Sequence, residues 1–362
     1  MISSDTYSGG RIIYDADSHV METREWLDPF LDDDLKARLR PLYGRKPNRI
    51  DKILDKAKAR KGNPEAEAAA FTNPIAGPKG WIAAGAFDPE ERTRVLDGFG
   101  FAGQLVFGTA GLAPARAAAA EGVLYAGARA HNEAMAAFCS QDERLYGVAY
   151  VPLDNHERAL LETDVALARG NRAIMFSAGP AGEKSPGHPD FDPIWARLAE
   201  ASVPVAFHLG DSGYEGRMAA AWGGSDHFEG FGNLDVLSRV LVADRAIHDT
   251  VAALIVHGAL ARHPGLRIAS IENGSDWIHL LAKRLRKQAN QTPWVFAEDP
   301  LDTIRRHVFT TPYLEEDLEK LVDLIGVDRV LFGSDWPHGE GVARPLDFQK
   351  ELGAFDEQAV QR

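Results

Sequence analysis

The chain has 362 residues, of which 45% are hydrophobic and 26% charged, a globular composition that excludes disorder as the main state. Its 40 Lys and Arg residues against 53 Asp and Glu residues give a net charge of −13, which excludes nucleic acid as a partner, because phosphate binding needs a clustered positive surface. Cys139 is the only cysteine, so an internal disulfide and a thiolate metal site are excluded, and any metal must be held by imidazole and carboxylate groups.

The N-terminal segment predicts no export, since MISSDTYSGGRII has neither a basic region followed by an apolar one nor an Arg-rich amphipathic face. The longest apolar stretch, residues 250–261, is too short for a bilayer and contains His257, so it predicts a buried helix. Together with the single cysteine, these features lead us to expect a cytoplasmic protein with no membrane partner.

Short β-branched runs alternate with helical patterns along most of the chain, which is typical of a parallel sheet whose strands are joined by helices. The predicted strands are residues 11–16, 102–108, 145–152, 171–177, 203–209, 267–272, 307–311 and 328–334. This alternation predicts an α/β fold, a (β/α)₈ TIM barrel, formed by residues 1–362 as a single domain. In such a barrel the reactive side chains lie at the C-terminal ends of the strands.

Three segments are longer than a minimal barrel needs. Residues 27–95 contain helical pieces, a basic run and Gly/Pro turns, and predict a helical insertion after the first strand that serves as a lid or an oligomer contact. Residues 211–234 follow the fifth strand, where a barrel enzyme builds its substrate pocket. The aromatic residues there that could line the pocket are Trp222, Phe228 and Phe231. A third, shorter insertion covers roughly residues 288–305.

Candidate metal ligands occur near the predicted strand ends. Asp17 and His19 lie two residues apart, so in a strand both side chains share a face and could reach one cation, although the pattern also fits a polar strand end. His208 ends an apolar run, where a hydrogen-bonded core histidine is the alternative. Asp335 follows the apolar run VLFG, and a buried carboxylate is costly unless it is paired or binds a metal. All four side chains fall on the same predicted rim, which predicts a shared metal site.

Four motifs carry a family resemblance: IIYDADSHVMET, VAFHLG, HPGLRIASIENGSDW and VLFGSDWPHGEG. They resemble the amidohydrolase superfamily, and most closely its amidohydrolase-related branch, which includes aminocarboxymuconate-semialdehyde decarboxylase and the resorcylate and carboxyvanillate decarboxylases. The resemblance spans about residues 11–345 and is specific for the fold and the metal site, but not for the substrate.

The resemblance implies that Asp17 and His19 are the first-strand ligands, where many members have His-Xaa-His, and that His208 is the fifth-strand ligand. It places the eighth-strand aspartate at Asp335. The predicted fourth strand ends without the lysine that is carbamylated in other amidohydrolases, which favours one metal ion. Where related decarboxylases have a catalytic histidine after the sixth strand, this chain has Glu272, which could serve as general acid or base or enter the coordination sphere.

Further residues are candidates for orienting the ligands or for holding a second ion. Glu22 could reach the site from the first loop, or it is an acid at a helix start. His338 follows Asp335 closely and is expected to orient the ligands rather than bind the metal. His257 is expected in a buried helix face, and Cys139 is expected to be inert packing.

Carboxylate and imidazole ligands suit Zn²⁺, Mn²⁺ or Fe²⁺. By resemblance, the expected reaction is the non-oxidative decarboxylation of a small aromatic or unsaturated carboxylic acid, with Asp335 or Glu272 delivering the proton. The alternative is hydrolysis of an amide, ester or lactone, with Asp335 as general base on a metal-bound water. A second ion on Glu22, Glu272, His257 or His338 would instead give a dinuclear iron or iron/manganese oxygenase. A non-catalytic binding subunit is the remaining alternative. The expected partners are a small-molecule substrate and a second copy of the chain in a homodimer.

Overall fold

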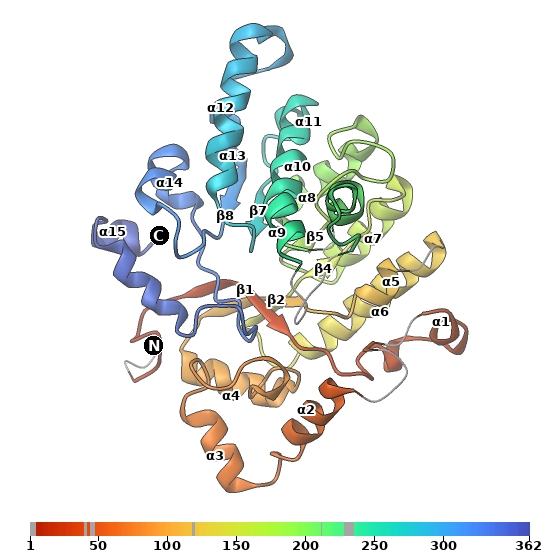
Figure 1. Cartoon of the computed structure of the whole chain (residues 1–362), viewed down its shortest axis with the longest axis vertical. Helices are drawn as coiled ribbons and strands as arrows, with labels where there is room; N and C mark the ends of the chain where they lie inside the picture. The colour runs from red at the N-terminus through yellow and green to blue at the C-terminus, as the bar shows by residue number, and fades with distance from the viewer. Residues whose placement is uncertain (1–4, 40–41, 44–47, 118–119, 211, 228–234) are drawn as a thin grey trace. The chain divides into compact units, whose positions relative to one another are not determined.

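The computed structural model describes residues 5–39, 42–43, 48–117, 120–210, 212–227 and 235–362 (Figure 1). The chain is divided into two compact units. The first unit consists of residues 1–150 and 332–349, and the second of residues 151–331 and 350–362. Among the described residues, no helix combines the length and the apolar character that a membrane crossing requires.

The first unit contains a parallel sheet in the order β1-β2-β3, with β1 (Tyr14–Val20), β2 (Gly103–Gly108) and β3 (Leu145–Gly147), and β4 (Ala149–Tyr150) follows it along the chain. Helices α5 (Ala113–Arg116) and α6 (Glu121–Cys139) connect β2 to β3. Beneath the sheet lies a buried apolar cluster that includes Val106 and Phe99, whose ring meets that of Trp336 edge-on at 5.4 Å. This contact anchors the segment after residue 332 to the core, and the segment continues into η8 (Pro345–Leu352).

The predicted insertion is helical. It contains η1 (Asp28–Phe30), α1 (Asp33–Arg38), α2 (Arg49–Lys58), α3 (Pro64–Thr72), η2 (Gly80–Ile82) and α4 (Pro89–Phe99). Local sequence explains the helix starts, because Asn63 and Asp88 are N-cap residues followed by proline at the first helical position. Helix α4 ends at Gly100, whose φ of 69° lies in the left-handed region that favours glycine.

The second unit contains a parallel sheet with the order β5-β6-β7-β8, formed by β5 (Ile174–Met175), β6 (Val205–His208), β7 (Ile268–Ile271) and β8 (Val308–Thr310). Helices separate these strands along the chain, as Figure 1 shows. They are α7 (His156–Ala168), α8 (Asp192–Ala201), α9 (Val236–Val242), α10 (Arg245–Val256), α11 (Ala259–Arg262), α12 (Asp276–Gln291) and α13 (Pro300–His307), with α14 (Leu318–Ile325) and α15 (Glu357–Val360) beyond β8. Short turns of helix complete the unit: η3 (Pro189–Phe191), η4 (Glu215–Ala219), η5 (Ala220–Trp222), η6 (Pro293–Val295) and η7 (Val327–Arg329).

The strands differ in detail from the predicted ones. The first strand runs from Tyr14 to Val20, so Asp17 and His19 lie inside it rather than beyond its end. The predicted third strand is divided into two, and the predicted eighth strand, 328–334, is not a continuous strand. Its last residues meet β1 irregularly, because the backbone N–H groups of Ser334 and Asp335 both donate to the Asp17 carbonyl, which leaves no regular ladder.

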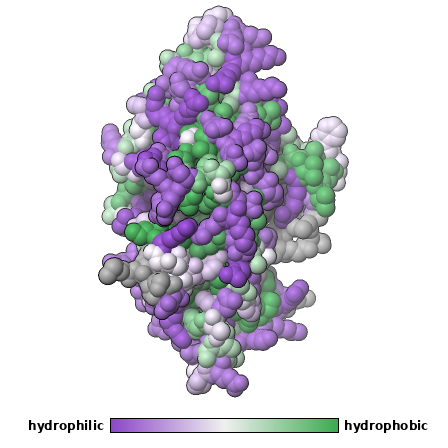
Figure 2. Space-filling model, turned by 90° about the vertical axis from the view of Figure 1, so that its left-hand side faces the viewer, coloured by the Kyte–Doolittle hydropathy of each residue, from purple (hydrophilic) through white to green (hydrophobic). Residues whose placement is uncertain are grey.

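The prediction of one buried helix over residues 250–261 is also wrong. Helix α10 ends at Val256 and α11 begins at Ala259, with Gly258 between them at a φ of 76°. His257 is exposed at this break, since the buried face of α10 is formed by residues such as Val251 and Leu254. On the face of the molecule shown in Figure 2, hydrophilic residues predominate, as expected from the large number of charged side chains.

We expect Asp88→Ala to lower the free energy of unfolding by about 1 kcal/mol, the usual effect of losing an N-cap. The Asp88 carboxylate accepts from the backbone N–H groups of Glu90 and Glu91, at 2.9 and 3.1 Å. Asp88→Asn keeps an acceptor for these groups and is the control, because it removes only the 3.1 Å ion pair with Lys61. The free energy of unfolding of both variants can be measured by chemical denaturation. An equal decrease in both variants would show that the ion pair, not the cap, stabilises the helix.

Candidate metal centre

In the first unit, two carboxylates meet one imidazole nitrogen. The Nε2 atom of His19 lies 3.3 Å from Oδ1 of Asp17 and 3.4 Å from Oδ1 of Asp335. Asp17 and His19 are buried, with 3% and 1% of their surface exposed. The structure therefore brings three of the predicted ligands together around one nitrogen atom.

Backbone hydrogen bonds to β1 fix Asp335 in this place. The Asp335 N–H donates to the Asp17 carbonyl at 2.8 Å, and the His19 N–H donates to the Trp336 carbonyl at 2.8 Å. The φ angle of Asp335 is 51°, a left-handed conformation that costs a non-glycine residue on the order of 1 kcal/mol or more. Such strain persists only where surrounding contacts hold it, so the position of the Asp335 carboxylate is strongly determined.

His338 supports the Asp335 carboxylate from the side. Its Nδ1 atom lies 2.8 Å from Oδ1 of Asp335, and its ring stacks on that of His19 with the centroids 3.8 Å apart. Its Nε2 atom lies 2.9 Å from the Thr109 hydroxyl, which donates its single proton to the Val20 carbonyl. The hydroxyl oxygen therefore accepts from Nε2, and this bond fixes the orientation of the His338 ring.

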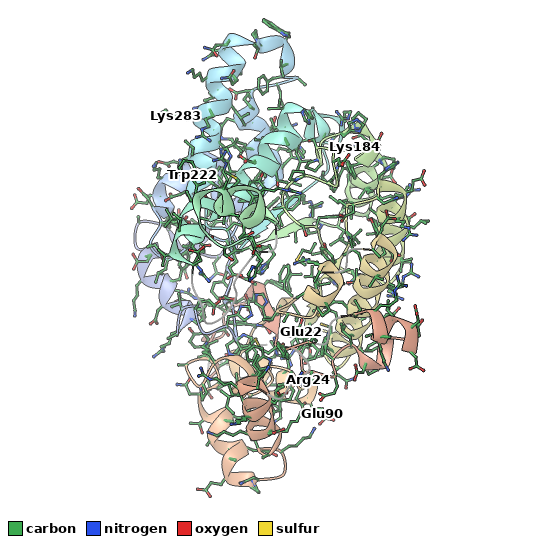
Figure 3. All side chains as sticks on the ribbon, turned by 45° about the vertical axis from the view of Figure 1, so that its right-hand side comes forward. Glu22, Arg24, Glu90, Lys184, Trp222 and Lys283 are labelled. Carbon is green, nitrogen blue, oxygen red and sulfur yellow. The ribbon has the colours of Figure 1, made fainter. Side chains whose placement is uncertain are left out.

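Glu22, labelled in Figure 3, is fully buried, and its carboxylate accepts hydrogen bonds from the backbone. It accepts from the N–H groups of Thr109, Ala110 and Gly111, at 2.9 to 3.0 Å, and lies 3.8 Å from His131. Burial raises the pKa of Glu22, but the interaction with the nearby His131 ring and the hydrogen bond from Ala110 outweigh it and hold the pKa below its ordinary value. The structure therefore uses Glu22 to order the loop that carries Thr109.

In the second unit, His208 and Glu272 lie side by side at the C-terminal ends of two neighbouring strands. His208 ends β6 opposite Ile271 of β7, and Glu272 comes directly after β7. The Nε2 atom of His208 lies 3.3 Å from Oε2 of Glu272. The Nδ1 atom lies 2.9 Å from the Leu209 carbonyl, and since a carbonyl only accepts, Nδ1 carries a proton. A neutral His208 thus directs a nitrogen lone pair at a carboxylate oxygen, which needs a proton or a cation between them.

Glu272 also has a left-handed backbone, with a φ of 58°. Its N–H donates to the Thr311 hydroxyl at 2.9 Å, and its carbonyl accepts from the Tyr313 hydroxyl at 2.6 Å. The Glu316 carboxylate accepts from both the N–H and the hydroxyl of Ser275, at 2.7 to 2.9 Å. The loop after β8 therefore clamps the loop after β7. Asp335 and Glu272 are two of the four described non-glycine residues with a φ of 50° to 60°, the others being Tyr43 and Ser202.

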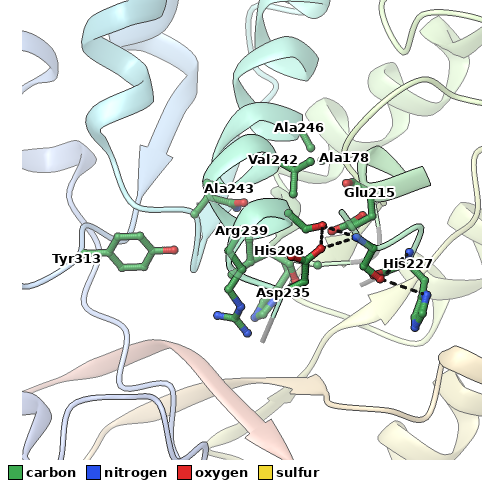
Figure 4. Close-up of a pocket in the computed structure, with 16 residues that line it drawn as sticks. Ala178, His208, Glu215, His227, Asp235, Arg239, Val242, Ala243, Ala246 and Tyr313 are labelled. Carbon is green, nitrogen blue, oxygen red and sulfur yellow. Dashed lines mark hydrogen bonds between the residues drawn. The ribbon is translucent and has the colours of Figure 1, made fainter. Parts of the chain in front are cut away.

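A cavity of about 160 Å³ in the second unit adjoins His208 (Figure 4). Polar groups on its wall include Arg239, Asn273 and the Tyr313 hydroxyl, which points toward the side of the cavity formed by α9. Its apolar side is lined by Ala178, Leu209, Val242, Ala243 and Ala246. The remaining lining residues are mostly polar or charged and include the carboxylates Glu215 and Asp235, so the cavity combines one apolar side with several hydrogen-bonding groups.

The glycine-rich segment 211–234 contributes Ser212, Glu215, Ser225 and His227 to this cavity. Trp222 does not line it and is 76% exposed, since the helical turn η5 directs its ring to the surface (Figure 3). Phe228 and Phe231 lie outside the described residues. The predicted segment therefore lines the cavity, as expected, but Trp222 does not take part in the lining.

His257 and Cys139 lie away from these groups. His257 bonds to the Ser185 hydroxyl at 2.7 Å on the exposed end of α10, and no described cluster of candidate ligands includes it. Burial raises the pKa of the Cys139 thiol to about 12, which keeps it unreactive.

Sequence patterns did not identify Thr109, Tyr313, Arg239 or Lys79. Lys79 is half-buried, and its ammonium donates to the Ile75 carbonyl at 2.7 Å. Burial lowers the pKa of Lys79 to about 8, while the negative charge of Asp335 opposes this shift. Threonine, tyrosine, arginine and lysine are common in loops, so only their tertiary contacts distinguish these four residues.

Parallel strands joined by helices, with aspartate and histidine side chains near the strand ends, are typical of barrel enzymes that bind metal ions. The amidohydrolase family model matches residues 14–362. A solved amidohydrolase from Mycobacterium avium subsp. paratuberculosis is 34% identical, with a TM-score of 0.78 over 97% of this chain and 96% of that one. The chain belongs to the amidohydrolase family.

More distant solved structures share the fold. A 5-carboxyvanillate decarboxylase from Novosphingobium aromaticivorans, with bound manganese, is 17% identical, with a TM-score of 0.62 over 97% of this chain and 93% of that one. A dihydroxybenzoic acid decarboxylase from a Polaromonas species, also with bound manganese, is 16% identical, with a TM-score of 0.56 over 97% of this chain and 92% of that one. The predicted fold class, an α/β TIM barrel with a helical insertion after the first strand, is thereby confirmed, and the chain is an enzyme of the amidohydrolase superfamily.

We expect Glu22→Gln to lower the melting temperature and to leave the number of bound metal ions per chain unchanged. An amide offers one acceptor oxygen where the carboxylate serves three N–H groups, and an unsatisfied buried group costs about 1–3 kcal/mol. Glu25→Gln, on an exposed neighbouring side chain, is the control and should change neither quantity. Calorimetry measures the melting temperature, and elemental analysis measures the number of bound metal ions. A loss of metal in Glu22→Gln would indicate that Glu22 is a ligand.

Proposed function

We propose that the chain binds one divalent metal ion through Asp17, His19, His208 and Asp335. One observation carries this proposal: two carboxylates face the same nitrogen of His19 at 3.3 and 3.4 Å. Two carboxylates that approach one imidazole nitrogen, one of them buried and the other 13% exposed, are costly unless a cation compensates their charge. Ligands about 2.1 Å from one ion, at angles near 90° to 110°, lie roughly 3.0 to 3.4 Å apart, which matches these distances.

His208 joins this ligand set by the general rule for parallel barrels, in which the C-terminal ends of the strands share one face. Its Nδ1 proton is committed to the Leu209 carbonyl, so a neutral ring offers Nε2 as the ligand atom. Carboxylate and imidazole donors suit Zn²⁺, Mn²⁺ and Fe²⁺, and the manganese bound in related decarboxylases makes Mn²⁺ the first ion to test.

We propose non-oxidative decarboxylation of a small aromatic or unsaturated carboxylic acid as the reaction. When bound, the ion would act as a Lewis acid on the substrate oxygens. The Arg239 guanidinium on the cavity wall would bind an anionic group, and Tyr313 would position it. As the carbon–carbon bond breaks, carbon dioxide leaves and the electron pair stays on the substrate carbon. Glu272, as the protonated acid, would then deliver a proton to that carbon.

Hydrolysis of an amide, ester or lactone is the second candidate. It is favoured by the 2.8 Å contact of Asp335 with His338 and the hydrogen bond of His338 to Thr109, since a carboxylate held in this way can accept a proton from water. The dinuclear oxygenase has less support, because Glu22 is bonded to backbone N–H groups and His257 is exposed beside Ser185.

We expect Asp335→Asn to abolish turnover, with a loss of about 10³-fold or more, and to leave the fold intact. We expect His208→Ala to lower the metal content of the purified protein. Far-ultraviolet circular dichroism, elemental analysis and carbon dioxide release from a panel of hydroxybenzoic acids measure these effects. Full activity and full metal occupancy in either variant would contradict the site assignment.

Glu272→Gln tests whether Glu272 takes part in the proposed decarboxylation. If Glu272 delivers the proton, carbon dioxide release should fall by about 10²-fold or more, the usual contribution of a general acid. The amide keeps the shape of the side chain, so metal content should not change. The matched control is Glu298→Gln, which removes a carboxylate paired with Arg306 elsewhere in the second unit. Unchanged carbon dioxide release in Glu272→Gln would remove Glu272 from the mechanism.

A further inference from the structure

Another buried carboxylate of the first unit, Asp15, adjoins the candidate metal centre without facing His19. Only 1% of Asp15 is exposed, and its two oxygens accept four hydrogen bonds. Oδ1 accepts from the N–H groups of Ser334 and Asp17, at 2.9 and 3.1 Å. Oδ2 accepts from the Ser334 hydroxyl at 2.6 Å and from the side-chain amide of Gln104 at 2.8 Å.

Gln104 connects Asp15 to a buried cation. Its side-chain oxygen accepts from Nη1 of Arg92 at 3.3 Å, so its amide group directs the oxygen to the cation and the nitrogen to the anion. Neither Gln104 nor Arg92 is exposed to solvent. Asp15 and Gln104 are direct partners in the pairing of β1 with β2, which places their side chains next to each other.

Arg92 reaches the same two chain segments as Asp15. Its Nε donates to the Gly85 carbonyl at 2.8 Å, and its Nη2 donates to the carbonyl of His19. Its guanidinium also lies 4.5 Å from the ring centre of Trp336, the residue after Asp335. The contacts of Asp15 and Arg92 therefore converge on the backbone that carries the proposed ligands.

Burying an acidic and a basic side chain in this way does not by itself stabilise the core. Apolar residues of similar volume often stabilise a core as well or better, so buried charges call for a further explanation. Here each of the charged groups is satisfied by hydrogen bonds, and those of Asp15 end on Ser334, directly before the strained residue Asp335. A fully satisfied polar network makes its surroundings rigid, which is what a metal ligand in a strained conformation requires.

We infer that Asp15 is a positioning residue for the metal site: linked through Gln104 to Arg92, it holds Ser334 so that the Asp335 carboxylate meets His19. This inference rests on the proposed function, in which Asp17, His19 and Asp335 bind one divalent ion. Asp15 acts through the backbone of its neighbours and does not touch the ion.

The test is the Mn²⁺ affinity of the metal-stripped full chain, measured by calorimetric titration beside the melting temperature. We expect Asp15→Asn to weaken Mn²⁺ binding about 10- to 100-fold, the usual effect of losing a group that orients a ligand. The asparagine amide has an N–H₂ group where one carboxylate oxygen of Asp15 accepts hydrogen bonds. The asparagine therefore cannot accept from all four groups that donate to Asp15. We expect Ser334→Ala, a small change that removes only the hydroxyl, to weaken binding to a lesser degree.

Asp51→Asn is the matched control in the same unit. It removes a carboxylate paired with Arg24 at 2.7 Å and should lower the melting temperature without changing Mn²⁺ affinity. If the wild-type chain binds Mn²⁺ but Asp15→Asn and Ser334→Ala bind it equally well, Asp15 is merely structural and the inference is overturned. If Asp15→Asn fails to fold, an unchanged affinity in Ser334→Ala is sufficient to overturn it. A wild-type chain that binds no divalent metal would instead overturn the proposed function and, with it, the inference.

Discussion

The constraint on which the first unit depends is the burial of negative charge around His19. Asp17 and Asp335 both approach Nε2 of this residue, and Asp15 lies on the same strand as Asp17. Burial raises the pKa of Asp15 to about 7, although Ser334 and Gln104 donate to it, which shows how unfavourable another charge is in this environment. A divalent cation would compensate the two carboxylates at His19 directly, and Arg92 compensates Asp15 through Gln104.

A second constraint is backbone strain at two acidic residues of the proposed site. Asp335 and Glu272 both adopt left-handed φ angles, and each is held by hydrogen bonds from segments distant in sequence. For Glu272 these bonds come from the loop after β8, through Thr311 and Tyr313. Strain maintained in this way fixes the direction of a side chain more precisely than rotamer preference alone, which suits groups that must meet an ion or a reacting carbon.

The sequence was sufficient for the parts that depend on local pattern. Asp17 and His19 could be paired from strand periodicity, and the ends of β6 and β7 from their apolar runs. It was insufficient where distant segments decide the outcome. The prediction of a regular eighth strand was wrong because two backbone N–H groups donate to one carbonyl of β1. The prediction of a buried His257 was wrong because the helix is interrupted at Gly258. Arg92 resembles any surface arginine of an amphipathic helix, so only the packed structure identifies it as buried.

The choice between decarboxylation and hydrolysis depends on which carboxylate can hold a proton. A carboxylate bound to a divalent cation is a poor proton donor, because the positive charge favours its ionised form. Asp335, facing His19 and fixed by His338, is therefore better suited to accept hydrogen bonds than to protonate carbon. Glu272 lies 3.3 Å from Nε2 of His208, beside a cavity that carries Arg239. In the proposed carboxy-lyase, Glu272 therefore has to remain outside the coordination sphere, because only a carboxyl group that is not bound to the ion can store a proton for carbon.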